Sequence, residues 1–279
     1  MSMKGDYTYK FSESPGEAAR LEQQAKAMEF ILEQELQVLK PISGMRVLDA
    51  GCGTGAVTRR LAKAVAPGEA YGVDFNPPFL SAAKEFAREK MVANIRFEEA
   101  SINSLPYPNG MFDMSYCRLV LMHMPDPFKT VSEMRRVTKT GGIVAASDVD
   151  DDAAIWYPET PALRSLFTRY AEFSKTRGSD RHIGRKLYEI FSRAGLSPVQ
   201  IVPFTFTATS ETPQVLRAFT GILSGILLQS KDDMIREGFA TEHDYDQAMR
   251  ERDFLLNHPG SFGMVSTLLA IGKNPQTSS

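Results

Sequence analysis

The residues best placed to do chemistry form one glycine-rich stretch. In it a short apolar run ends in an acid and three alternating glycines, Val47-Leu48-Asp49-Ala50-Gly51-Cys52-Gly53-Thr54-Gly55. This pattern predicts a buried strand that turns sharply into a helix beginning near Ala56, with a bare backbone against which a ligand can lie. The amides that open such a helix favour negative charge on the ligand.

A second acid follows at a distance suited to binding a ribose. Residues 70–73 predict a neighbouring parallel strand, which ends on Asp74. In nucleotide-binding folds a carboxylate about twenty residues beyond the glycines accepts hydrogen bonds from the ribose hydroxyls. The two features together predict a site for a nucleoside-containing cofactor.

The glycine spacing alone does not decide which cofactor binds. Gly51, Gly53 and Ala56 also satisfy the relaxed G-x-G-x-x-G/A pattern of dinucleotide-binding proteins. Asp49, however, would repel a pyrophosphate and attract a cationic amino-acid group. In addition, no tyrosine is followed four residues later by a lysine, which is the usual pairing in reductases. S-adenosyl-L-methionine (SAM) is therefore favoured over a nicotinamide dinucleotide.

At these positions the sequence resembles the class I SAM-dependent methyltransferases, specifically the small-molecule branch related to ubiquinone-biosynthesis enzymes. The resemblance spans roughly residues 40–150 and rests on four ordered segments: the glycine stretch 48–55, Asp74, residues 105–113 and the run 121–127. It implies an α/β fold with a Rossmann-like sheet of seven strands, one of them antiparallel at the edge. It also implies that the three glycines cradle SAM, that Asp49 faces its amino-acid end, and that S-adenosyl-L-homocysteine is the product.

The N-terminal segment, residues 1–40, is expected to cover the cofactor. A capping-box start at Ser14 is followed by apolar residues at helical spacing as far as Leu39, which predicts one long helix. In the related enzymes this region folds over the cofactor, and the resemblance implies that Tyr9 and Arg20 reach the methionyl part of SAM. An arginine can bind a carboxylate through two hydrogen bonds. A solvated helix charge is the alternative for Arg20.

Residues after the second and third predicted strands are expected to meet the adenosine. Phe75 directly follows the ribose acid, and residues 95–98 predict the third strand. Where the related enzymes place an aspartate for the adenine amino group, this chain has Ser101, followed by Ile102. A serine oxygen can still accept that hydrogen bond, and the Ile102 amide can meet a ring nitrogen of adenine.

Two cysteines and one histidine fall near the predicted cofactor site. Cys52 and Cys117 lie at the ends of inner strands, where small buried thiols are expected to pack beside the cofactor rather than act as nucleophiles. His123 enters the substrate side, where it is a possible general base, with a structural histidine near Asp126 as the alternative. No histidine or cysteine cluster has metal-binding spacing, and the acidic run 148–152 is interpreted as a solvated loop, so no metal is expected.

The C-terminal half contains a helical insertion at residues 212–258. On an α/β sheet such an insertion must cover the carboxyl edge or meet another subunit. We interpret it as a lid over an apolar substrate contacted by Phe219 and Leu223, with extra core or a dimer surface as the alternative. The SAM-binding domain then comprises residues 41–211 and 259–275.

Composition limits the partners of the chain. Its 279 residues, 43% of them apolar, can bury a large core. The net charge of −2 and the lack of a basic block argue against nucleic acid and anionic membranes. The N-terminus has no apolar signal segment and no apolar run approaches membrane-spanning length, which predicts a cytoplasmic protein, as a monomer or homodimer.

Taken together, the motifs predict a SAM-dependent methyltransferase that acts on a small, largely apolar molecule. In-line methyl transfer depends mainly on positioning and desolvation, so an unmistakable base is not required. Among secondary-metabolite methyltransferases the chain is similar to fungal enzymes that S-methylate the dithiols of gliotoxin-type compounds, and a thiol ionises with little help. The alternatives are O-, N- or C-methylation of another metabolite, an NAD(P)-dependent oxidoreductase, a non-catalytic SAM-binding protein and, more remotely, a tRNA or protein methyltransferase.

Overall fold

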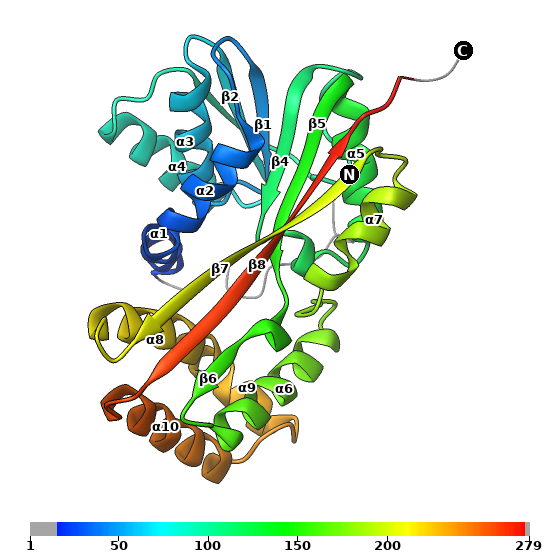
Figure 1. Cartoon of the computed structure of the whole chain (residues 1–279). Coiled ribbons are helices and arrows are strands. Elements are labelled where there is room, and N and C mark those ends of the chain that lie inside the picture. The colour runs from blue at the N-terminus through cyan, green and yellow to red at the C-terminus, as the bar shows by residue number, and fades with distance from the viewer. Residues whose placement is uncertain (1–15, 277–279) are drawn as a thin grey trace.

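The computed structural model describes residues 16–276 (Figure 1), which form a central sheet with helices on both faces and a helical cap beyond one end. The strands are β1 (Arg46–Ala50), β2 (Glu69–Asp74), β3 (Ile95–Glu99), β4 (Phe112–Arg118), β5 (Thr138–Val149), β6 (Ile155–Tyr157), β7 (Val199–Thr209) and β8 (Phe262–Lys273). The α-helices are α1 (Glu17–Ala27), α2 (Glu29–Leu39), α3 (Ala56–Val65), α4 (Pro77–Glu89), α5 (Pro127–Val137), α6 (Pro161–Lys175), α7 (Leu187–Arg193), α8 (Pro213–Gln229), α9 (Lys231–Arg236) and α10 (Glu242–Asn257). Three short 3₁₀ helices are η1 (Leu121–His123), η2 (Asp151–Ala153) and η3 (Gly184–Lys186).

The predicted α/β Rossmann-like fold is confirmed. The strands follow the order β3-β2-β1-β4-β5-β8, and neighbours among β1 to β5 pair in parallel, whereas β8 is antiparallel to both β5 and β7. Inner strands such as β1 carry apolar residues on both faces, here Val47 and Leu48, because both faces of the sheet are covered. On one face α2 and α3 pack against Val47 and Tyr116, and on the other α5 and α7 pack against Leu48 and Cys117.

The sheet has eight strands, one more than the seven expected. The extra strand is β6, whose three residues pair with the first part of β8, from Phe262 to Met264. β5 pairs only with the later part of β8, from Thr267 onward. β8 extends beyond the end of β5, and the edge of β8 that β5 leaves unpaired there pairs with β6, the short segment that follows η2.

The prediction of a single N-terminal helix is wrong, because the structure has two helices, α1 and α2, that meet at Met28. The N-cap of α1 is Gly16, at a φ of 84°, and not Ser14 as expected from the sequence. Ser14 and Tyr9 both lie outside the described residues. Buried residues of α2, including Leu32, pack on the sheet, whereas α1 lines a pocket beside it. The break lets the two segments face these different surfaces.

The cap lies where β7 and β8 extend past the rest of the sheet (Figure 1). Its main core joins α6 to the inserted helices, with Leu166 and Phe173 packed near Leu227 and Tyr245. A second core surrounds Trp156 of β6. None of the described helices is long and apolar enough to cross a bilayer.

Candidate cofactor and substrate sites

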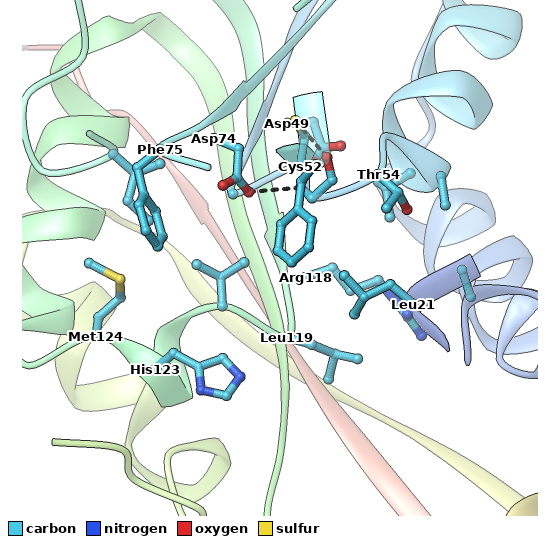
Figure 2. A pocket seen from close by; sticks show the side chains of 18 of the residues that line it. Leu21, Asp49, Cys52, Thr54, Asp74, Phe75, Arg118, Leu119, His123 and Met124 are labelled. Carbon is cyan, nitrogen blue, oxygen red and sulfur yellow. Dashed lines mark hydrogen bonds between the residues drawn. The ribbon is translucent and has the colours of Figure 1, made fainter. Parts of the chain in front are cut away.

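A cavity of about 470 Å³ lies at the carboxyl ends of β1, β2 and β4 (Figure 2). The ends of these parallel strands form its floor, and α1 contributes Leu21 and neighbouring residues to its wall. The segment from Leu119 to Met124 closes another side. Ligands of open α/β sheets bind at this edge, so the cavity is the candidate cofactor pocket.

The glycine turn forms one wall of this pocket. Gly51 has a φ of 78°, and a Cβ added there would lie 2.7 Å from Val120, so a side chain does not fit. Among residues 16–276, Gly53, at a φ of 50°, has only Leu21 within 4 Å of its added Cβ position, so these residues leave its backbone accessible to a ligand. Gly55 is the N-cap of α3, packs against Phe97 and does not line the cavity.

Asp74 lies beside this turn at the end of β2. Its carboxylate accepts hydrogen bonds from the backbone N–H groups of Gly53 at 2.8 Å and of Asn76 at 2.9 Å. Burial raises the pKa of Asp74 although these bonds lower it. A carboxylate has about four lone-pair sites, so capacity remains for the hydroxyls of a ribose.

Asp49 is buried at the end of β1 and lines the same cavity. It accepts a hydrogen bond from the Thr58 hydroxyl at 2.5 Å. Burial raises the pKa of Asp49 to about 7, with a further increase from the charge of Asp74. A cationic group of a ligand would favour its ionised form.

The residues expected to meet the adenosine lie together on the β2 and β3 side of the pocket. Phe75, Ser101 and Ile102 all line it, and the Ser101 hydroxyl accepts from the backbone N–H of Asn103 at 3.3 Å. Cys52 lines the pocket as well, with its pKa raised well above the ordinary value by burial. Cys117 is fully buried in the core behind β4 and does not line the pocket, which places it apart from the other predicted residues.

A second cavity, of about 160 Å³, lies between the sheet and the cap. Its wall is mainly apolar and includes Trp156, Phe219 and Leu223. The rings of Trp156 and Phe219 lie 5.5 Å apart, and Phe206 lies at the same distance from Phe219. The structure thus places both predicted substrate residues in a cavity separate from the glycine turn.

The two cavities share a wall. Arg20, Gln24, Leu119, Met122 and His123 line both of them. The guanidinium of Arg20 donates to Glu17 at 2.7 and 2.8 Å and to Gln24 at 2.9 Å. Burial lowers the pKa of His123 to about 3, helped by the positive charges of Arg181 and Arg20, so its ring is neutral near pH 7.

The acidic residues that follow β5 form ion pairs with two arginines, Arg181 and Arg185. Asp150 and Asp152 both accept from Arg185, and Asp151 accepts two hydrogen bonds of 2.8 Å from Arg181. Ligand atoms of Asp150, Asp152 and His182 lie within 4.8 Å of one another. Because Arg185 already compensates the two carboxylates, the cluster is interpreted as an ion-pair network.

The charged residue Arg118 is among the pocket residues that were not predicted from the sequence. Arg118, the last residue of β4, lines the cofactor pocket and donates through Nε to Glu35 of α2 at 2.8 Å. The only signal in the sequence is its position one residue after Cys117. The partner Glu35 is more than eighty residues away along the chain, too far for a local pattern to connect them.

The residues present fit SAM. An accessible glycine backbone and the two buried carboxylates Asp74 and Asp49 line one pocket, and these groups are suited to a ribose and to a cationic amino-acid group. The fold and this site define a nucleoside-binding α/β protein of the class I methyltransferase type.

The comparisons agree with this class. Residues 42–195 match a family described as "Methyltransferase domain". The chain belongs to that family and is a SAM-dependent methyltransferase, which decides against the oxidoreductase and the non-catalytic binding protein considered above. It is 29% identical to a demethylmenaquinone methyltransferase of Geobacillus over 62% of this chain and 80% of that one.

Two further proteins show the range of similar chains. The "Probable methyltransferase ltbC" of Aspergillus luteorubrus is 34% identical over 47% of this chain and 49% of its own. A phosphoethanolamine N-methyltransferase of Haemonchus contortus in complex with S-adenosylhomocysteine has a TM-score of 0.62 and 16% identity, over 95% of this chain and 59% of that one. The structural likeness concerns the fold alone.

Proposed function

We propose that the chain transfers the methyl group of SAM to a nucleophile on a small, largely apolar molecule held in the second cavity. The acceptor we favour is a thiol of a gliotoxin-type dithiol. The observation that carries the proposal is the wall shared by the two cavities, formed by Arg20, Gln24, Leu119, Met122 and His123. A substrate there lies beside the methionyl side of the cofactor pocket, as in-line transfer requires.

The character of the second cavity favours an apolar substrate. Trp156, Phe219 and Leu223 provide the flat and aliphatic surfaces that ligand sites commonly use. Helix α8, which carries Phe219 and Leu223, would together with α6 form a lid that keeps water from the transfer. Burial of apolar surface contributes about 25 cal/mol per Å² to binding.

The state of His123 favours an acceptor that ionises readily. A histidine whose pKa is held at about 3 is a weak base for an alcohol or phenol. A thiol has an ordinary pKa near 8.5, so a substantial fraction is already thiolate at mildly alkaline pH. We therefore assign His123 the role of a neutral hydrogen-bonding group that orients the acceptor.

The volume of the second cavity has a consequence for the size of the substrate. A cavity of about 150 Å³ holds one benzene ring, and the second cavity measures about 160 Å³. A bicyclic dithiol is larger than one ring. Its binding would therefore require the helices α6 and α8, which line the cavity, to move away from the sheet.

Transfer of labelled methyl from SAM to a panel tests the proposal. The panel contains a reduced dithiol, a phenol, an amine and bulk tRNA. We expect label on the dithiol and none on tRNA, because the near-neutral chain offers no basic block for phosphates. Label on the phenol or amine alone would contradict the thiol assignment and leave the methyltransferase class intact.

A further inference from the structure

Arg118 has a buried donor that no described residue satisfies. Its side chain is only 6% exposed, and Nε donates to Glu35 at 2.8 Å. Nη2 is buried and has no hydrogen-bond partner within residues 16–276. A buried donor without an acceptor costs roughly 1–3 kcal/mol, so such a group in a pocket wall points to an acceptor on the ligand.

Glu35 fixes the position of this guanidinium. It is fully buried on α2 and accepts from the hydroxyls of Tyr116 at 2.8 Å, of Ser147 and of Thr267 at 3.5 Å, besides Arg118. These donors come from β4, β5 and β8. The carboxylate is thus held by three strands, and it holds Arg118 against one edge of the cofactor pocket.

The sheet order places Arg118 at the methionyl end of that pocket. β1 lies between β2, which ends in the ribose acid Asp74, and β4, which ends in Arg118. In Figure 2, Phe75 and Arg118 lie on opposite sides of Asp74 and Cys52. A ligand whose adenosine meets Phe75 therefore extends its amino-acid end toward Arg118.

The charges there suit a zwitterion. Asp49 and Arg118 line the same pocket, and they are close enough for the charge of Arg118 to lower the pKa of Asp49. One offers a site for an ammonium group and the other for a carboxylate. Arg20, by contrast, already directs all three of its guanidinium nitrogens at Glu17 and Gln24.

We infer that Arg118, positioned by Glu35, binds the α-carboxylate of the SAM methionyl group, in place of the Arg20 expected from the sequence. The inference rests on SAM occupying the pocket at the glycine turn. Glu35 is then a positioning residue, because it acts on the cofactor only through Arg118. Loss of the carboxylate contact should affect only ligands that carry a carboxylate.

The test compares two ligands that differ only in that group, SAM and decarboxylated SAM. Their dissociation constants are measured by calorimetry on the full chain, without acceptor. We expect the wild type to prefer SAM by about tenfold or more, since hydrogen bonds to charged groups are among the stronger ones. Arg118→Lys keeps the positive charge near Glu35 but loses the planar guanidinium, which can donate two parallel hydrogen bonds to a carboxylate. The preference for SAM over decarboxylated SAM should then fall to about twofold or less.

Matched variants separate binding from folding. Arg59 is also mostly buried and pairs with the partly exposed Glu22 at 2.7 Å, but it does not line the pocket, so Arg59→Lys should leave the preference unchanged. Glu35→Gln should reduce the preference less than Arg118→Lys. Where Arg118→Lys fails to fold by circular dichroism, the double variant Arg118→Met with Glu35→Gln removes both charges and should also abolish the preference.

Three results would overturn the inference. Equal weakening of both ligands by Arg118→Lys would show a structural role only. Loss of the preference in Arg20→Gln with its retention in Arg118→Lys would assign the carboxylate to Arg20. Failure of the wild type to bind either ligand would contradict the cofactor site itself, a result distinct from the other two.

Discussion

The two cavities are built in different ways. Most of the cofactor pocket comes from residues 49–124, where successive strand ends of one parallel sheet meet. The second cavity gathers residues from α1, the β5 end, β6, α6, α8 and β8, which are spread over most of the chain. The first has the carboxylates Asp49 and Asp74 at its floor. The second has an aromatic and aliphatic wall on the cap side, with charged residues such as Asp151 and Arg181 elsewhere in its lining.

The two cavities therefore recognise their ligands by different physical interactions. A polar floor at fixed strand ends recognises a ligand by hydrogen bonds and charge, which depend on a few exact positions. An apolar wall recognises by shape and burial, which many residues share. Changes at residues that line only one cavity should therefore leave binding in the other nearly unchanged, and four experiments examine that separation and the wall that the cavities share.

The largest effect is expected for Asp74→Ala in the cofactor pocket. Removing the carboxylate loses two charged hydrogen bonds to a ribose, each contributing about 1.5–3 kcal/mol, so S-adenosylhomocysteine should bind about 100-fold more weakly or worse. Calorimetry measures the constant. Asp152→Ala, on the exposed loop near the second cavity, is the control and should change it less than about twofold. An effect of the same size in both variants would contradict the separation.

Acidic pH should weaken cofactor binding through Asp49. Its pKa is raised to about 7 in the free protein, so below that pH it is mostly neutral. A cationic ammonium group favours the ionised form, and binding must then release a proton. Affinity should rise with pH, approaching a tenfold change per unit below 7, and level off above it.

The comparison variant for this pH dependence is Asp49→Asn, which cannot ionise. Its affinity for S-adenosylhomocysteine, measured from pH 5.5 to 8.5, should be lower at neutral pH and flatter. An unchanged pH profile in Asp49→Asn would assign the titration to another group, such as Asp74, whose pKa is also raised by burial.

Substitution in the second cavity should alter acceptor binding alone. Phe219→Ala and Leu223→Ala remove apolar surface from its wall, and each should lower kcat/KM for the dithiol by about tenfold. The dissociation constant of S-adenosylhomocysteine should stay within about twofold. Leu228→Ala changes an exposed leucine of the same helix and serves as the control. Equal loss in the control would show that the helix is merely destabilised.

The smallest effect is expected at the shared wall. Because the pKa of His123 is lowered to about 3 by burial and nearby arginines, we expect His123→Gln to reduce kcat for a thiol by less than about tenfold. The measurement is the steady-state rate between pH 6 and 9. Removal of a true general base typically costs about 100-fold or more, and such a loss would restore His123 to that role.

Much of the fold and of the cofactor site could be predicted from the sequence. The apolar runs around Val47 and 70–73, the glycine turn and Asp74 are local signals, and parallel strands bring their carboxyl ends to one edge. The helix that begins at Pro127 also follows a local signal, since its N-cap Asp126 accepts a hydrogen bond from the Lys129 amide at 3.0 Å. The break at Met28 and the strand β6 were missed, because both depend on which distant surface each segment meets.

The class of protein and the cofactor could be predicted from the amino-acid sequence alone, because both follow from short local patterns. The folded structure was needed to show that Phe219 and Leu223 line a cavity adjoining the cofactor pocket, and that Glu35 holds Arg118 at the end of β4. Contacts between residues far apart in the chain leave no period or spacing in the sequence. They arise when helices and strands pack, and they govern how the molecule selects and orients what it binds.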